Sequence, residues 1–178
     1  PKRRGAELCY PARMSIHTLD LEFQGLPHAI ASYLVVGPRG PVLVETGPAS
    51  TLPILERELG RLGYAVEDIR DVLVTHIHLD HAGAAGWWAT RGARIYVHEV
   101  GAPHLIDPAK LLKSARRIYG DQLERLWGEV LPAPADRVVA VADGDTIDAG
   151  GLRFLALDTP GHAGHHHVYR LDEVAFTG

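Results

Sequence analysis

The segment DVLVTHIHLDHAG, residues 71–83, passes from an apolar run into four potential metal ligands within six positions. The apolar run predicts a buried strand, and the alanines and glycines after it predict a helix over about 82–91. The four ligands are His76, His78, Asp80 and His81. Side chains alternate between the faces of an extended chain, so the first two point to one side. As the chain turns into the helix, the last two can swing toward a neighbouring point. The segment therefore offers two imidazoles to one metal ion, and an imidazole with a carboxylate to a second.

A further imidazole is available where another predicted strand ends, in Asp158-Thr159-Pro160-Gly161-His162. The Pro-Gly turn holds His162 on a rigid loop. Imidazole and carboxylate suit Zn²⁺, and catalytic zinc sites use about three protein ligands and keep one position for water. A lone histidine is more often a surface or core residue than a ligand. Four potential ligands directly after a strand instead favour a metal site, with His162 as the third imidazole.

The composition is that of a soluble globular domain, with 46% apolar and 22% charged residues in 178. No apolar run approaches the ~18 residues of a membrane span, and no secretory signal is visible, so we expect a cytoplasmic protein without a membrane partner. Eighteen Lys and Arg against 22 Asp and Glu give a net charge of −4, which argues against a nucleic-acid partner. The single cysteine, Cys9, excludes an internal disulfide framework and a Cys-rich zinc site.

Strand and helix patterns alternate along the chain, which predicts a mixed α and β layered domain. Residues 1–13 have no such period and are expected to be a disordered or upstream tail, so that the domain spans 14–178. A helical segment over about 101–131 lies between the two histidine loops. Its larger apolar residues are predicted to face the core: Leu111, Leu112, Ile118 and Trp127. The predicted strands are 16–23, 31–36, 42–44, 71–75, 93–97, 137–141, 152–157, 166–171 and 174–176, and a further helix is predicted over about 52–62.

The order of these motifs resembles the metallo-β-lactamase superfamily, and within it the glyoxalase-II-like hydrolases. The motifs are His76-x-His78-x-Asp80-His81, Thr159-Pro160-Gly161-His162 and Phe176-Thr177-Gly178. The resemblance covers about Ile16 to Gly178. It implies an α+β fold, a four-layer αββα sandwich with a metal site at one edge of the two sheets. In that family His76, His78 and His162 would hold the first metal ion, and Asp80 and His81 would contribute to a second. Zinc is the expected metal, with iron or manganese as alternatives.

The resemblance implies a hydrolase that uses a metal-activated water on a small ester, thioester or lactone. Asp80 would be catalytic, either by holding a second metal ion or by taking a proton. A phosphodiesterase or nuclease of the same superfamily is an alternative, against which the net charge counts. An iron-dependent sulfur dioxygenase is another, and the ligands do not exclude it. His78 argues against the diiron oxygen-reducing branch, which has glutamate there. A binding domain that merely kept the fold is less favoured, because every expected ligand in the sequence is retained.

Two features depart from the family pattern. The family places a bridging aspartate directly after the Thr-Gly pair and a further histidine near the C-terminus, whereas this sequence stops at Gly178. We therefore expect the C-terminal part of the domain to be missing and the second metal site to be incomplete. The family also often has aspartate where this chain has Glu45, which either orients a metal-side histidine or is an acidic turn residue.

The remaining histidines near these motifs have less certain roles. His166 follows His162 by four residues, a position where the family often has histidine, and it either supports the metal ligands or is structural. His165 and His167 are expected to be solvated or to lie on alternate faces of the next strand. His104 opens the helical segment beside the predicted site and has no assigned role.

Overall fold

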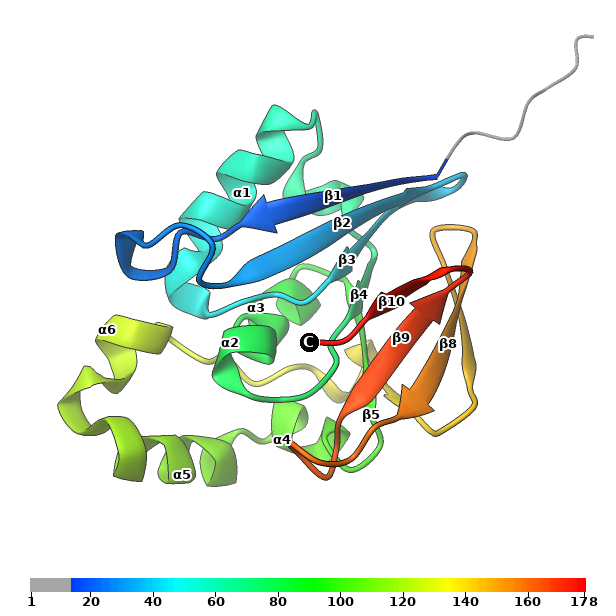
Figure 1. Ribbon diagram of the computed structural model, residues 1–178. Coiled ribbons are helices and arrows are strands. Elements are labelled where there is room, and N and C mark those ends of the chain that lie inside the picture. Colours follow the sequence, from blue (N-terminus) through cyan, green and yellow to red (C-terminus); the bar gives the residue numbers. More distant parts are fainter. Residues whose placement is uncertain (1–13) are drawn as a thin grey trace, which may run out of the picture.

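The computed structural model describes residues 14–178, so the tail expected over 1–13 lies outside the described residues (Figure 1). Two β-sheets lie face to face, as expected for an α+β sandwich. The larger sheet has the strand order β1 (Ser15–Asp20), β2 (Ala31–Gly37), β3 (Gly40–Val44), β4 (Asp71–Leu73), β5 (Arg94–His98), β6 (Val138–Val141). The smaller has the order β10 (Val174–Phe176), β9 (His167–Leu171), β8 (Leu152–Asp158), β7 (Thr146–Ala149).

Helices form a third layer on the outer face of the larger sheet. They are α1 (Leu52–Arg61), α2 (Leu79–Ala82), α3 (Ala85–Thr90), α4 (Ala102–Ile106), α5 (Ala109–Tyr119) and α6 (Leu123–Trp127). Short 3₁₀ turns connect the elements: η1 (Phe23–Gly25), η2 (Ala49–Thr51), η3 (Val66–Asp68), η4 (Gly120–Gln122) and η5 (Ala135–Arg137). Residues 14–178 thus form both sheets of an αββα sandwich and the helix layer that covers the larger sheet. None of the helices within 14–178 is long and apolar enough to cross a membrane.

The direction of the central strands brings the histidine loops to one edge of the fold. Strands β1, β2 and β3 form antiparallel hairpins, whereas β3, β4, β5 and β6 run parallel. Parallel neighbours end at the same edge, and the chain must cross over between them through a helix or loop. The residues directly after β4 and β5 therefore lie side by side. These are the loop that begins with Val74 and the turn after His98.

Two apolar cores hold the layers together. The core between the sheets contains Val44, Leu73, Phe154, Tyr169 and Phe176, all buried. Tyr169, on β9, also donates a hydrogen bond from its hydroxyl to the backbone oxygen of Val74, at 3.1 Å. Because Val74 follows β4, this bond fixes the smaller sheet against the start of the histidine loop.

The second core lies between the larger sheet and the helices. Its buried members include Leu43, Leu55, Val72, Trp88 and Ile95. Leu55 belongs to the helix expected over 52–62, whose last turn ends at Gly63 with φ of 84°. Glycine adopts this left-handed conformation without steric cost, which is the usual way for a helix to end.

Two elements differ from expectation. The helix expected over 82–91 is two short helices, α2 and α3, separated at Gly83 and Ala84. Gly83 has no room for a side chain, because a Cβ there would lie 2.3 Å from the backbone oxygen of Leu79. The sequence reading also missed β7, a strand of only four residues between glycine-containing turns.

Within 101–131, α4 packs on the larger sheet, whereas α5 and α6 form a satellite layer with its own small core. Trp127 is buried there between Phe23 and Tyr119, with ring centroids 5.3 and 5.2 Å away. Leu111 and Leu112 are half-buried. The prediction that Ile118 is buried is wrong, since its exposed fraction is 75%. Only Ala115 of α5 is fully buried, so this helix rests on the domain by a narrow stripe and leaves a larger apolar side chain open to solvent.

Candidate metal centre

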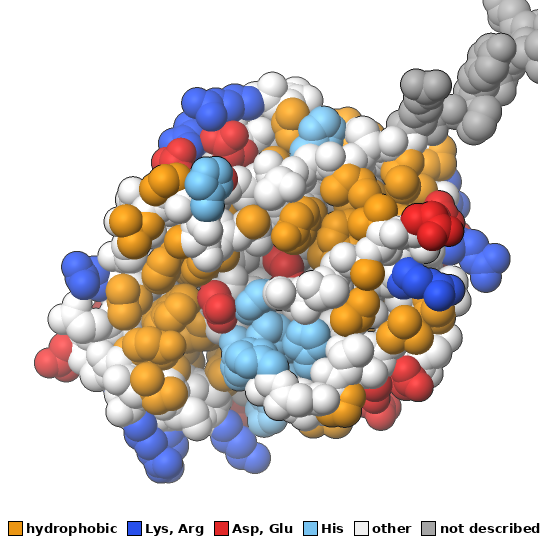
Figure 2. All heavy atoms as spheres, viewed as in Figure 1, with side chains coloured by type: hydrophobic (Ala, Val, Ile, Leu, Met, Phe, Trp, Pro, Cys, Tyr) orange, Lys and Arg blue, Asp and Glu red, His pale blue; other side chains and the backbone are white. Residues whose placement is uncertain are grey.

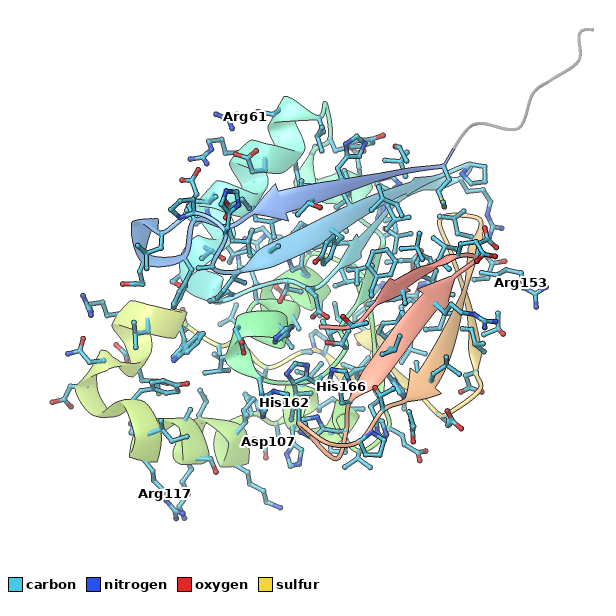
Figure 3. All side chains as sticks on the ribbon, viewed as in Figure 1. Arg61, Asp107, Arg117, Arg153, His162 and His166 are labelled. Atoms are coloured by element: carbon cyan, nitrogen blue, oxygen red, sulfur yellow. The ribbon has the colours of Figure 1, made fainter. Side chains whose placement is uncertain are left out.

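Three histidines from two distant segments of the chain converge at the edge of the sheets. Figure 3 labels one of them, His162, together with the nearby His166. His76 lies in the loop after β4, and His78 directly precedes α2. His162 comes from the loop between β8 and β9. Each offers one ring nitrogen, and these nitrogens all lie within 4.8 Å of one another. The ring centroid of His76 is 4.7 Å from that of His78 and 5.0 Å from that of His162.

The hydrogen bonds of these rings leave free nitrogens. Nδ1 of His76 lies 3.0 Å from Oγ1 of Thr75, whereas its Nε2 is buried and has no hydrogen-bond partner. A buried polar atom without a partner costs ~1–3 kcal/mol, so this nitrogen lacks something that a bound group would supply. Nδ1 of His78 lies 3.0 Å from Nε2 of His162. This donor set fits a divalent metal ion, which binds neutral imidazole nitrogens.

The environment keeps the rings of His76 and His78 neutral. Burial, reinforced by the neighbouring His81, lowers the pKa of His76 to about 2. Burial and the nearby ring of His162 also lower the pKa of His78. A neutral imidazole has a lone pair that an imidazolium lacks, so both side chains are able to bind a cation at physiological pH.

Asp80 and His81 form a second pair beside the three histidines. Both belong to α2, and Nε2 of His81 lies 3.4 Å from Oδ2 of Asp80. The ring centroid of His81 is 4.1 Å from that of His76. Burial alone would raise the pKa of Asp80, but its contact with His81 lowers it below the usual range. Asp80 is therefore ionised at neutral pH, as a cation ligand must be.

Glu45 stands behind this pair and is 2% exposed. Its Oε1 accepts a hydrogen bond from the backbone N–H of Thr75 at 3.1 Å, and its Oε2 lies 3.5 Å from Nδ1 of His81. Burial would lower the pKa of His81, but its contacts with Asp80 and Glu45 raise it to about 10. The position of Glu45 matches a residue that orients a metal-side histidine rather than a solvated turn residue.

His166 supports the same loops from the other side. Its Nδ1 lies 2.7 Å from Oγ1 of Thr159, and its ring centroid is 5.0 Å from that of His76. Gly178 packs against His166 as well. Its φ of 80° favours glycine, and a larger residue would not fit, because a Cβ here would lie 2.6 Å from Oγ1 of Thr75. His104 is not among the residues whose ligand atoms cluster with these histidines.

A second cluster of possible metal ligands, His98, Asp158 and His167, was not predicted from the sequence. Nε2 of His167 lies 2.8 Å from Oδ1 of Asp158, and Nε2 of His98 lies 3.4 Å from the same oxygen. His167 is fully buried at the start of β9, so of the two expectations for it, solvated or on a face of the next strand, the second is confirmed. By spacing alone this group could hold a metal ion.

The protonation of His98 argues for a different role of this group. Nδ1 of His98 accepts a hydrogen bond from the backbone N–H of Val100 at 3.0 Å. The neutral ring then carries its proton on Nε2, which suits the carboxylate of Asp158 and not a metal ion. Because His98 ends β5 and Asp158 ends β8, the contact joins the two sheets below the loop that carries His162.

Comparison with protein families and solved structures agrees with this geometry. The family model described as the metallo-beta-lactamase superfamily matches residues 25–178. A metallo-beta-lactamase family protein from Thermus thermophilus superposes with a TM-score of 0.72 at 26% identity, over 92% of this chain and 58% of that one. A native metallo-beta-lactamase from Legionella gormanii superposes with a TM-score of 0.66 at 22% identity, over 90% of this chain and 58% of that one. The expected fold is thereby confirmed.

Curated relatives are similar over most of this chain but are longer. A metallo-beta-lactamase fold-containing protein from Sulfurisphaera tokodaii is 26% identical over 167 residues, which cover 92% of this chain and 61% of that protein. An atrochrysone carboxyl ACP thioesterase from Aspergillus chevalieri is 31% identical over 151 residues, 83% of this chain and 38% of that protein. The chain thus spans less than two thirds of the length of these relatives.

Proposed function

The chain belongs to the metallo-beta-lactamase superfamily, and from this premise we propose that it is a metal-dependent hydrolase of a small carboxylic ester, thioester or lactone. The observation that carries the proposal is the unpartnered, buried Nε2 of His76 beside the facing nitrogens of His78 and His162. A bound metal ion would explain why these three imidazoles, from the loops after β4 and β8, meet at one edge of the sheets.

These three histidines would hold the first metal ion, with zinc as the preferred candidate because of the all-imidazole ligand set. When bound, such an ion supplies a water of lowered pKa and a Lewis acid for the substrate carbonyl. Oγ1 of Thr75 lies 3.0 Å from Nδ1 of His76, and Nε2 of His162 faces Nδ1 of His78. The chain would therefore contribute ligands that already lie close together before a metal ion binds.

Asp80 would act next to this site. Its ionised carboxylate, with 41% of the side chain exposed, is accessible to a substrate or a water molecule. It would either hold a second ion together with His81, which would have to give up its proton first, or accept the proton that a water loses on attack. Glu45 keeps His81 in position by facing its Nδ1, and it does not itself reach the open face of the site, since it is 2% exposed.

Two findings favour a carboxylic acyl substrate over a phosphodiester. One relative of this chain is named as an acyl carrier protein thioesterase. The cavity that opens beside His78 and His162 has no lysine or arginine in its lining. Enzymes that bind phosphate groups usually place cationic side chains around them. Esters and thioesters, which are uncharged at the reacting carbonyl, suit this lining better.

A comparison of substrate classes tests the proposal. The zinc-loaded chain would be assayed with acyl thioesters, esters and lactones, with a phosphodiester, and with a persulfide under oxygen uptake. We expect turnover in the first group that is lost on chelation and in His162→Ala, and kept in His28→Ala, whose side chain is 90% exposed. Turnover of only the phosphodiester, or only the persulfide, would replace the proposal by one of the alternative activities.

A further inference from the structure

A cavity of about 370 Å³ opens directly beside the candidate metal centre. At one end it is lined by His78, Asp80 and His162, and the rest of its wall comes from α5, α6 and the start of α2. The residues of this wall are Leu79, Leu111, Ser114, Ala115, Ile118, Tyr119 and Trp127. The volume falls within the ~300–1,000 Å³ typical of small-molecule sites. We call this space the α5 cavity.

The wall of the α5 cavity is apolar because of the way in which α5 is oriented. Leu111, Ala115 and Ile118 recur at helical spacing and share one face of the helix. The long cationic side chains of α5 are on its other sides: Lys110, Lys113, Arg116 and Arg117 are absent from the lining. Figure 2 shows apolar side chains gathered beside the pale-blue histidines, with cationic side chains along the lower edge.

The base of the cavity is rigid. Trp127 is stacked on Phe23 with an interplanar angle of 23°, and Tyr119 packs edge-on against it at 66°. Trp127 is 8% exposed, so its position is fixed by packing on several sides. A wall that is already formed needs little ordering when a ligand binds, which preserves affinity.

Ile118 is the unusual member of this wall, since it is 75% exposed while the smaller Ala115 on the same face is buried. When a ligand enters a concave apolar site, an exposed apolar side chain at the rim is removed from water, which favours binding. The only charged group in the lining is Asp80, at the metal end. The ligand portion that fits the rest of the cavity is therefore an uncharged hydrocarbon.

We propose that the α5 cavity binds the acyl chain of the substrate, and that Ile118 is a specificity-determining residue at its rim. This inference rests on the proposed function, because it assigns the chain to the acyl side of the ester or thioester whose carbonyl lies at the histidines. The substrate is thus a medium-length aliphatic acyl ester or thioester, and an acetyl group leaves the cavity unfilled.

Binding to the metal-free protein tests this site without any reaction. Acetamide, butanamide and octanamide would be titrated while the NMR signal of the Ile118 methyl group is followed. Each buried methylene strengthens binding by up to about fourfold, so affinity should rise steeply from acetamide to octanamide. Equal affinity for the three amides, or no shift of the Ile118 signal, would overturn the proposal.

Two variants and a control sharpen the test. Ile118→Ser should weaken octanamide binding by about threefold to tenfold, because it removes apolar contact area at the rim. Ser114→Trp, which fills part of the lining, should weaken the binding of octanamide far more than that of acetamide. Leu62→Ser is the matched control, because Leu62 is also an exposed aliphatic residue and follows Arg61 at the far end of α1 (Figure 3).

The kinetic measurement separates this inference from the proposed function. With zinc bound, kcat/KM should rise from acetyl to octanoyl thioester, and Ile118→Ser should flatten this increase while Leu62→Ser keeps it. Octanamide binding that depends on Ile118, without hydrolysis of any ester, would support the acyl site and contradict the hydrolase. Hydrolysis with equal kcat/KM for the two thioesters and no effect of Ile118→Ser would support the hydrolase and overturn the acyl site.

Discussion

Nδ1 of His78 faces Nε2 of His162 at 3.0 Å, although the two residues are 84 positions apart. Two ring nitrogens at this distance either share one proton or direct two lone pairs at a common cation. Burial and the proximity of His162 lower the pKa of His78, which disfavours an imidazolium. The loop after β4 and the loop between β8 and β9 therefore bring two potential metal ligands face to face in the metal-free chain.

Replacing Glu45 with glutamine tests its role behind His81. Glutamine keeps an acceptor for the N–H of Thr75 but removes the negative charge that faces Nδ1 of His81. In the metal-free protein the pKa of His81 should fall from about 10 toward the ordinary 6.5. An NMR titration of the ring protons measures this change, with Glu56→Gln on the exposed side of α1 as the control. A pKa of His81 that stays the same in Glu45→Gln would contradict the assigned role.

The free energy of unfolding of the metal-free protein should depend on pH through His76. In the folded chain His76 stays neutral down to about pH 2, whereas in the unfolded chain it takes up a proton near pH 6.5. The unfolded state thus binds more protons between these values, and stability falls on acidification below pH 6.5 by up to about 1.4 kcal/mol per pH unit. His81 acts in the opposite sense, since its contribution is complete below pH 6.5 and is lost as pH rises toward 10.

Urea unfolding between pH 4 and 9 measures both limbs of this profile. His76→Gln should flatten the acid limb, because glutamine does not titrate, whereas His28→Gln at an exposed position should leave it unchanged. An acid limb of the same slope in His76→Gln and in the unmodified protein would show that His76 is not the buried neutral group described here.

Trp127 and Ile118, both predicted from the sequence to be buried, should contribute very different amounts to the free energy of unfolding. Trp127→Ala removes a buried ring between Phe23 and Tyr119 and should lower the free energy of unfolding by about 3–5 kcal/mol. Ile118→Ala, at a 75% exposed position, should change it by less than about 0.5 kcal/mol. Denaturant midpoints provide the comparison. Similar losses in the two variants would mean that Ile118 packs against the domain.

The candidate metal site could be predicted from the sequence because its proposed ligands follow local rules. The motif from His76 to His81 occupies six consecutive positions after a strand, and His162 follows a Pro-Gly turn, so neither depends on distant pairing. Sequence reasoning left the role of Glu45 open. Its side chain meets His81 only because β3 and β4 are parallel neighbours, which the local pattern does not specify.

Features that arise from tertiary packing could not be predicted from the sequence pattern. The contact of Asp158 with His98 and His167 joins three strands from two sheets, and no spacing in the sequence links these residues. The exposure of Ile118 has a similar cause. Helical periodicity identifies the apolar face of α5, but how much of that face is covered depends on where α6 and η1 lie.

The most direct test is the metal content of the purified chain and its variants after loading with zinc and dialysis. The chain itself, His28→Ala and Asp158→Asn should retain bound metal. In the double variant His76→Ala, His78→Ala the bound metal per chain should fall by about tenfold or more, because two of the three imidazoles are removed. Asp158→Asn tells the two histidine groups apart. If this variant loses its metal, the ion is bound by His98, Asp158 and His167 instead. Equal metal content in the unmodified chain and the double variant would contradict the account.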